Sequence, residues 1–370
     1  MNSEERFIIK IVNIFIGLNG EELEEEELIN LNWGDVIFLS TCHRVLPIVA
    51  KIILESNIAY VLNSNILKLL KCVLNENIEN DKKKVNEAKQ LSNILYKNNI
   101  NGMLIKGPIN SIVLYPGLGY RTYEDIDILV NKADLQKLKK ILVDNNYRQG
   151  KIDFNTQKFI EANRKDIIHK ELCTHETIEF YKFENDNLTD IMIDINHSLS
   201  WKGHDSYLGY PSFTVDKLLN NKKIMKDNEI IIRPSNEDLF LYIVVHLYNE
   251  AIFFCWQICW EYNYGDIQLI KFIDVILAMK NEMDWEKVDK LIAEYNIREP
   301  VEYTLTCIFE LFGNNVIPNS MRKYISKIEE IDFYYDIEGN KHYWEMSFKN
   351  RVFEPKKRVN EIRMKKEGNV

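Results

Sequence analysis

Two aspartates within an apolar run place the strongest constraint on the fold of this chain. Residues 125–130 have the sequence Asp-Ile-Asp-Ile-Leu-Val. Side chains two positions apart on a β-strand face the same side, so Asp125 and Asp127 point together while Ile126 and Ile128 face a core. Neighbouring carboxylates raise each other's pKa unless a cation lies between them, and Mg²⁺ prefers carboxylate oxygens. The segment predicts a buried strand whose acidic edge binds a divalent metal, with a solvated strand end as the alternative.

A turn ahead of this strand has the features of a phosphate-binding element. Lys106-Gly107-Pro108 follows the apolar run 103–105 and precedes a helical stretch that extends to Leu114. Glycine lacks a Cβ and lets a phosphate approach the backbone, and proline suits the first helical position. Free N–H groups at a helix N-terminus attract anions, and Lys106 adds a positive charge. A plain turn with a solvent-facing lysine is the alternative.

A third acid lies inside a later strand. Residues 190–196 have the sequence Asp-Ile-Met-Ile-Asp-Ile-Asn, in which the isoleucines face one side of a strand and the other four residues face the opposite side. An acid flanked by isoleucines is costly to bury unless it is paired or binds metal. Asp194 is therefore predicted to bind a second metal ion or to act as general base. Asp190 is the competing candidate at the more easily solvated start of the strand.

The order of predicted elements indicates an α+β fold, in which a central mixed α/β unit is flanked by two helical regions. We expect an N-terminal helical region over 1–85, a core over 86–200, and a mostly helical C-terminal domain over 201–370. The chain ends in a segment rich in Lys and Arg, Lys349–Lys366, which is interpreted as a solvated basic tail. Binding of an acidic partner or nucleic acid is the alternative for this tail.

Apolar periodicity predicts the individual elements. Asp134 is expected to be the N-cap or a first-turn acid of a helix with an apolar stripe at Leu135, Leu138, Ile141 and Leu142. Residues 166–183 are expected to be rich in strand. The predicted helices of the C-terminal domain are Glu237–Tyr248, Ile267–Met279, Trp285–Tyr295 and Val301–Phe312.

Composition argues against a secreted or membrane-spanning protein. A net charge of −9 does not steer a protein toward nucleic acid or an anionic membrane. Six cysteines spread over 370 residues do not form a disulfide framework. The apolar stretches 7–18 and 239–260 both contain polar residues, so they predict neither a signal peptide nor a membrane span. We expect a cytoplasmic protein without a membrane partner.

The pattern of these residues resembles a known family. The similarity to the uncharacterised nucleotidyltransferase family, within the polymerase-beta-like nucleotidyltransferase superfamily, rests on Leu104-Ile105-Lys106-Gly107, Leu114-Tyr115-Pro116, Arg121, Asp125–Val130 and Asn146-Tyr147. It continues through Ile193-Asp194-Ile195 and through a helical part with Glu237-Asp238, His246, Phe272-Ile273-Asp274 and Asp284-Trp285. The resemblance covers approximately residues 85–315.

This resemblance implies that Asp125, Asp127 and Asp194 hold Mg²⁺ or Mn²⁺. It further implies that Lys106 and Gly107 hold the triphosphate of an NTP such as ATP, and that Arg121 contacts phosphate. The proposed reaction transfers a nucleoside monophosphate to an acceptor and releases pyrophosphate. The candidate acceptors are a small molecule, a peptide or a protein, with an RNA end as the less favoured alternative. The NTP, the acceptor and the oligomeric state stay open.

Three other hypotheses stay open beside this one. The first is a non-catalytic nucleotide-binding scaffold or sensor, and the second is a metal-dependent phosphohydrolase or kinase. The third is a toxin-type nucleotidyltransferase that acts on tRNA or protein.

Two positions depart from the family pattern. The superfamily commonly has Gly-Ser or Gly-Gly in the phosphate turn, whereas this chain has Lys106-Gly107. The family tends to have a histidine two residues after the third acid, whereas this chain has Asn196 there and His197 next to it. Neighbouring residues on a strand face opposite sides, so the role of that histidine is not carried over to His197.

Other polar and aromatic residues are interpreted more simply. His246 lies in an apolar helix and is expected to be a hydrogen-bonded core residue. Cys255 and Cys259, one helical turn apart, lack the ligand set of a zinc site. Cys173 and His175 would point apart on a strand, which disfavours a nucleophile and base. The aromatic run 253–264 is expected to belong to the core, with an acceptor pocket as the alternative.

Overall fold

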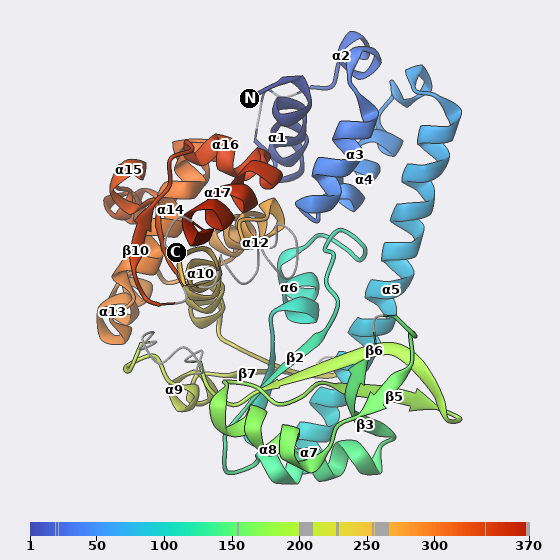
Figure 1. Ribbon diagram of the computed structural model, residues 1–370, viewed down its shortest axis with the longest axis vertical. Coiled ribbons are helices and arrows are strands. Elements are labelled where there is room, and N and C mark those ends of the chain that lie inside the picture. Colours follow the sequence, from blue (N-terminus) through green and yellow to red (C-terminus); the bar gives the residue numbers. More distant parts are fainter. Residues whose placement is uncertain are drawn as a thin grey trace.

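A mixed β-sheet lies among helices in the computed structural model, confirming the α+β fold (Figure 1). The structure describes residues 1–18, 20, 22–153, 155–199, 210–226, 229–253, 255, 266–336 and 338–367. In Figure 1, helices α7 and α8 lie below the sheet, and most of the N-terminal and C-terminal helices lie above it.

Six strands form the main sheet in the order β1-β2-β6-β5-β3-β4. The central strands β2 and β6 are parallel, and the other neighbouring pairs are antiparallel. The strands are β1 (Gly102–Ile105), β2 (Ile126–Val130), β3 (Tyr147–Ile152), β4 (Phe159–Glu161), β5 (Phe180–Glu184) and β6 (Asn187–Asn196). The helices between them are α6 (Gly107–Leu114), α7 (Leu135–Asp144) and α8 (Arg164–Cys173).

The long helix α5 (Ser64–Lys97) joins the N-terminal helices to the sheet, as Figure 1 shows. Its first turn is capped by Asn63, whose side chain accepts a hydrogen bond from the Asn65 amide. The residues that it buries include Val85, Ala88 and Leu91. The proposed boundary between the first two regions, at residue 85, falls inside this helix. The preceding helices are α1 (Ser3–Phe15), α2 (Glu25–Asn30), α3 (Trp33–Cys42) and α4 (Leu46–Glu55).

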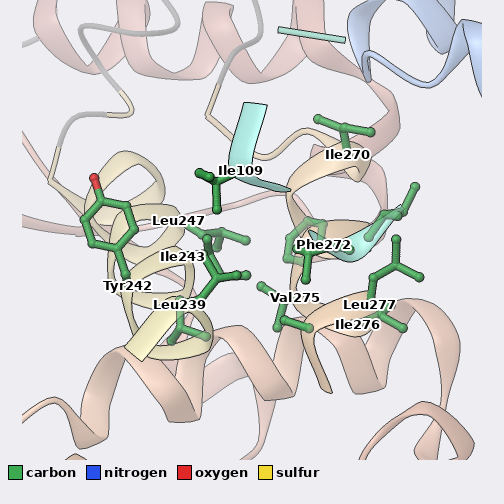
Figure 2. Close-up of a cluster of buried hydrophobic side chains, with 14 of the residues drawn as sticks. Ile109, Leu239, Tyr242, Ile243, Leu247, Ile270, Phe272, Val275, Ile276 and Leu277 are labelled. Carbon is green, nitrogen blue, oxygen red and sulfur yellow. The ribbon is translucent and has the colours of Figure 1, made fainter. Parts of the chain in front are cut away.

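The C-terminal helices share one hydrophobic core with the helix that follows β1. Figure 2 shows Ile109 of α6 beside side chains of two later helices, with Ile243 and Leu247 from α10 and Phe272 and Val275 from α12. All of these side chains are buried, and burial of each large apolar side chain contributes about 2 kcal/mol. This core therefore ties the turn before α6 to the C-terminal part of the chain.

The remaining elements belong to the C-terminal part. They are α9 (Val215–Asn220), β7 (Lys223–Lys226), β8 (Ile230–Arg233), α10 (Asn236–Ile252), α12 (Leu269–Lys280), α13 (Trp285–Tyr295), α14 (Arg298–Phe312), α15 (Ile328–Ile331), β9 (Phe333–Tyr335), β10 (Lys341–Tyr343), α16 (Phe348–Phe353) and α17 (Pro355–Glu367). The four predicted helices of this part are confirmed, with small differences at their ends. Among the described residues, no helix combines the length and apolarity needed to cross a membrane.

The prediction of strand over 166–183 is wrong for its first half, because α8 occupies residues 164–173. Asn163 starts this helix by accepting a hydrogen bond from the Asp166 amide. No residue of α8 is buried, so the helix has no apolar stripe that periodicity could detect. Asp134 does occupy the N-cap position of α7, but its carboxylate accepts from the Asn101 amide instead of capping the helix.

The basic tail is not simply solvated, which corrects the expectation from the sequence. The side chains of Arg351 and Arg358 are fully buried, and they pair with Asp332 and with Asp266, respectively. A buried arginine needs such a partner because an unpaired charge is costly to remove from water. Two of the basic residues of this segment, Arg351 of α16 and Arg358 of α17, are therefore buried in ion pairs and do not belong to a solvated face.

The substitution Gly119→Ala should destabilise the fold, because Gly119 has φ +86° and a Cβ there would lie 3.0 Å from the Ile78 Cα. The strained backbone and the clash together should lower the free energy of unfolding by about 3 kcal/mol. Gly117→Ala is the matched control, since its Cβ would make only an ordinary 3.6 Å contact with Tyr120. Urea denaturation that gives equal stability for both variants would contradict this account.

Candidate functional site

Three carboxylates meet where the two parallel strands of the sheet lie side by side. Asp125 directly precedes β2, Asp127 lies within β2, and Asp194 lies opposite Asp127 in β6. One oxygen from each carboxylate lies within 4.8 Å of the other two. The structure thus brings together the three acids that the sequence singled out.

The environment of these acids fits a divalent cation. Asp127 is only 2% exposed, and the Oδ1 atom of Asp194 is buried without a hydrogen-bond partner among the described residues. Burial raises the pKa of Asp127 to about 6, an effect that Lys106 opposes and Asp125 strengthens. Burial, with Asp125 and Asp127, also raises the pKa of Asp194 well above its usual range. A cation would relieve this crowding of charge, and carboxylate oxygens are the ligands that Mg²⁺ prefers.

Lys106 reaches this centre from a strained backbone position. Its φ of 49° and ψ of −125° are uncommon for a residue with a Cβ, and such strain concentrates at functional sites. The Lys106 Nζ donates to Asp127 Oδ1 at 2.9 Å, and the Asn196 side-chain amide donates to the same oxygen at 3.2 Å. The predicted phosphate-binding lysine therefore lies directly against one of the three acids.

Gly107 is required by the protein's own packing. A Cβ at this position would lie 2.7 Å from Tyr123 Cδ2 and 2.9 Å from the Asp125 carbonyl oxygen. The turn at 106–107 therefore packs tightly against the segment that carries the first acid. This contact is a reason for glycine that is separate from the predicted approach of a phosphate.

Arg121 is held by a buried carboxylate on α12. Its Nε and Nη2 atoms donate to Asp274 at 3.0 and 2.8 Å, and Nη1 faces the Gly107 carbonyl oxygen at 3.5 Å. Asp274 also accepts from the Tyr115 hydroxyl at 2.8 Å and from the Asn110 amide at 2.9 Å. Arg121 thus lies beside the turn at 106–107, and the phosphate contact predicted for it would have to form with this ion pair in place.

A second buried carboxylate, Asp81 on α5, holds the same segment from the other side. It accepts hydrogen bonds from the Ser111 hydroxyl, the Gly119 amide and the Tyr123 hydroxyl, at 2.6–2.7 Å. Sequence reasoning missed Asp81, although one signal was present. Asp81 precedes Val85 and Ala88 at helical spacing, so it is an acid on the apolar stripe of α5.

Comparison with known proteins agrees with this geometry. The profile of the family described as "Uncharacterised nucleotidyltransferase" matches residues 30–313, which is most of the chain. The chain belongs to the uncharacterised nucleotidyltransferase family. The match begins well before the predicted limit near residue 85, so it includes α3, α4 and α5 as well as the sheet. No curated protein matches the chain.

Asn196 occupies the position at which this nucleotidyltransferase family tends to have a histidine. Its amide bonds to Asp127, whereas the neighbouring His197 bonds through its backbone N–H to the His175 carbonyl at 2.9 Å. His197 lies just beyond the end of β6, which stops at Asn196.

His246 is paired rather than packed only among apolar side chains. Its Nδ1 lies 3.4 Å from Glu250 Oε2, which also receives Lys271 Nζ at 2.5 Å. Although burial alone would raise the pKa of Glu250, Lys271 and His246 hold it at about 2. The contacts of Glu250 with Lys271 join α10 to α12.

Cys173 and His175, weighed as a nucleophile and base, contact different neighbours. Cys173 Sγ lies 3.6 Å from His169 Nδ1, whereas His175 faces Glu176 at 3.5 Å. Cys259 and most of the aromatic run 253–264 lie outside the described residues, and Phe253 stacks on Tyr335. Within the described ranges, the three aspartates are the group able to hold a metal ion.

Asp194→Asn should stabilise the metal-free protein at pH 7 by about 1 kcal/mol, because it removes a buried negative charge beside two others. The raised pKa values mean that the folded state binds more protons than the unfolded chain above about pH 4. For Asp127 this extends to about pH 6, and stability falls as pH rises through these raised pKa values. Urea denaturation in EDTA measures the change. Asp190→Asn, on the same strand but exposed and paired with Lys83, is the control. An Asp194→Asn protein less stable than wild type at pH 7 would contradict the prediction.

Proposed function

We propose that this chain transfers a nucleoside monophosphate from an NTP to an acceptor, with release of pyrophosphate and with Mg²⁺ or Mn²⁺ held by Asp125, Asp127 and Asp194. The observation that carries the proposal is the meeting of three carboxylates where the parallel strands β2 and β6 adjoin. One of these carboxylates has a buried oxygen without a partner among the described residues. Membership of the nucleotidyltransferase family supports the reaction class.

The reaction joins an acceptor oxygen to the α-phosphorus of the NTP and breaks the bond between the α-phosphorus and the bridging oxygen. Pyrophosphate leaves with the electron pair of that bond. The proton of the acceptor hydroxyl passes to a carboxylate, for which Asp194 is the proposed base because its Oδ1 atom has no hydrogen-bond partner among the described residues. Bound divalent metal supplies Lewis-acid stabilisation of the charge that develops on the phosphate oxygens.

The phosphate-binding groups are proposed from the turn that leads into α6. Lys106 supplies a positive charge beside Asp127. Helix α6 begins at Gly107, and backbone N–H groups in the first turn of a helix attract anions such as phosphate. Arg121 lies next to this turn while Asp274 holds it in place. Lys106, Gly107 and Arg121 are accordingly the proposed nucleotide-binding residues.

The acceptor is proposed to be a small molecule, a peptide or a protein. A net charge of −9 disfavours the binding of nucleic acid, whose phosphate backbone attracts basic proteins. A cytoplasmic setting is also proposed, and the free state of Cys42, Cys72, Cys173, Cys255 and Cys307 supports it.

Asp127→Asn should reduce pyrophosphate release roughly a hundredfold or more, as for the loss of a group that stabilises transition-state charge. Release is measured with each of the four NTPs, with Mg²⁺ or Mn²⁺, and with a cell extract as the source of acceptor. Asp190→Asn is the matched control because Asp190 lies on the same strand as Asp194 but is exposed and bonded to Lys83. Circular dichroism confirms that each variant is folded.

Each outcome of this experiment separates the proposal from a rival. Full activity in a folded Asp127→Asn protein would overturn the site assignment. Release of inorganic phosphate or ADP would identify a phosphohydrolase or a kinase instead. NTP binding without release would point to a scaffold or sensor, or to an acceptor missing from the extract. A toxin is tested separately, by growth arrest on expression that is lost with Asp125→Ala.

A further inference from the structure

Lys84 on α5 lies against the segment that carries the first acid of the site. Its Nζ donates to the Tyr123 carbonyl oxygen at 2.7 Å and lies 5.3 Å from the centre of the Tyr123 ring. Tyr123 is two residues before Asp125, and the same ring packs on Gly107. Lys84 is therefore placed beside both the acidic centre and the turn proposed to bind phosphate.

Lys84 differs from the other lysines around the site in what its ammonium group contacts. Lys106, Lys83 and Lys170 each contact a carboxylate, at 2.9, 3.2 and 2.6 Å. Among the residues that the structure describes, no carboxylate lies within 4.0 Å of Lys84 Nζ, and its hydrogen bond is to a neutral carbonyl. Lys84 is also half-buried, and burial lowers the pKa of its ammonium group.

A partly buried ammonium group without a contacting anion is poorly compensated for the loss of water. The carboxylate that acts on Lys84 most strongly is Asp125, one of the proposed metal ligands. A metal ion bound there would neutralise the charge of Asp125, so less negative charge would remain near the ammonium group of Lys84. A polyphosphate carried on that metal would supply the missing negative charge.

We propose that Lys84 binds the polyphosphate of the NTP. Lysine suits this role because its ammonium group is a compact point charge on a flexible stem. The inference rests on the proposed function, because it takes the three aspartates as the metal site. It adds a nucleotide-binding residue from a helix that precedes the sheet in the chain.

The rival role for Lys84 is to hold the Tyr123 carbonyl, and thus Asp125, in place. Two substitutions distinguish the roles. Lys84→Gln removes the charge but keeps an N–H donor for a carbonyl, whereas Lys84→Met removes both. Lys84→Arg keeps the charge. Lys83→Gln is the matched control, since Lys83 is adjacent in sequence, more exposed and already paired with Asp190.

The experiment measures binding of tripolyphosphate to the full chain in Mg²⁺ by calorimetry, because this probe does not depend on which base the site accepts. We expect Lys84→Gln and Lys84→Met each to weaken binding about tenfold, as for the loss of one charge-assisted contact. Lys84→Arg and Lys83→Gln should stay close to wild type. Circular dichroism and urea denaturation check that each variant is folded.

Two results would overturn the inference without touching the proposed function. The first is wild-type affinity in Lys84→Gln together with weak binding in Lys84→Met, which would assign Lys84 to positioning alone. The second is wild-type affinity in both variants. If wild type fails to bind tripolyphosphate or any NTP in Mg²⁺, the proposed function itself fails, and the inference fails with it.

Discussion

Parallel pairing of β2 with β6 is the constraint on which the candidate site depends. The pairing sets Asp127 opposite Asp194, so that two acids share one face of the sheet while their isoleucine neighbours are buried. The backbone hydrogen bonds of two central strands hold this register, and a slip of one residue would turn one acid into the core. Burial and the neighbouring carboxylates raise the pKa values of Asp127 and Asp194. The packing around the site therefore holds the acids together against their mutual repulsion.

Two further carboxylates hold the loop that leads into β2. Asp81 of α5 and Asp274 of α12 lie far apart in sequence, yet both bind the segment between α6 and Asp125. Each is buried and satisfied by several donors, which makes the removal of one costly. The N-terminal and C-terminal parts thus contribute directly to the position of Asp125. Both carboxylates lie within the family match over residues 30–313.

Much of the central block could be predicted because its signals are local. The strand 126–130, the helix from Gly107 to Leu114 and the buried stripe of α7 follow from alternation, from proline at a helix start and from apolar spacing. The helix α8 could not be predicted in this way, because it buries no residue and has no stripe. The buried arginines of the C-terminal segment were also missed, since a run of basic residues has the same composition whether or not partners such as Asp332 and Asp266 cover it.

The sequence by itself determined which residues are candidates for the site: the acids at 125, 127 and 194, and the Lys-Gly turn before them. Residue type and spacing suffice for this, because strand geometry places alternate side chains on one face. Only the tertiary structure decided what surrounds them. The ion pair of Arg121 with Asp274, the bond of Asn196 to Asp127 and the approach of Lys84 to Tyr123 join residues separated by 39–153 positions. Contacts of that kind depend on how helices pack on the sheet, and no local pattern in the chain encodes them.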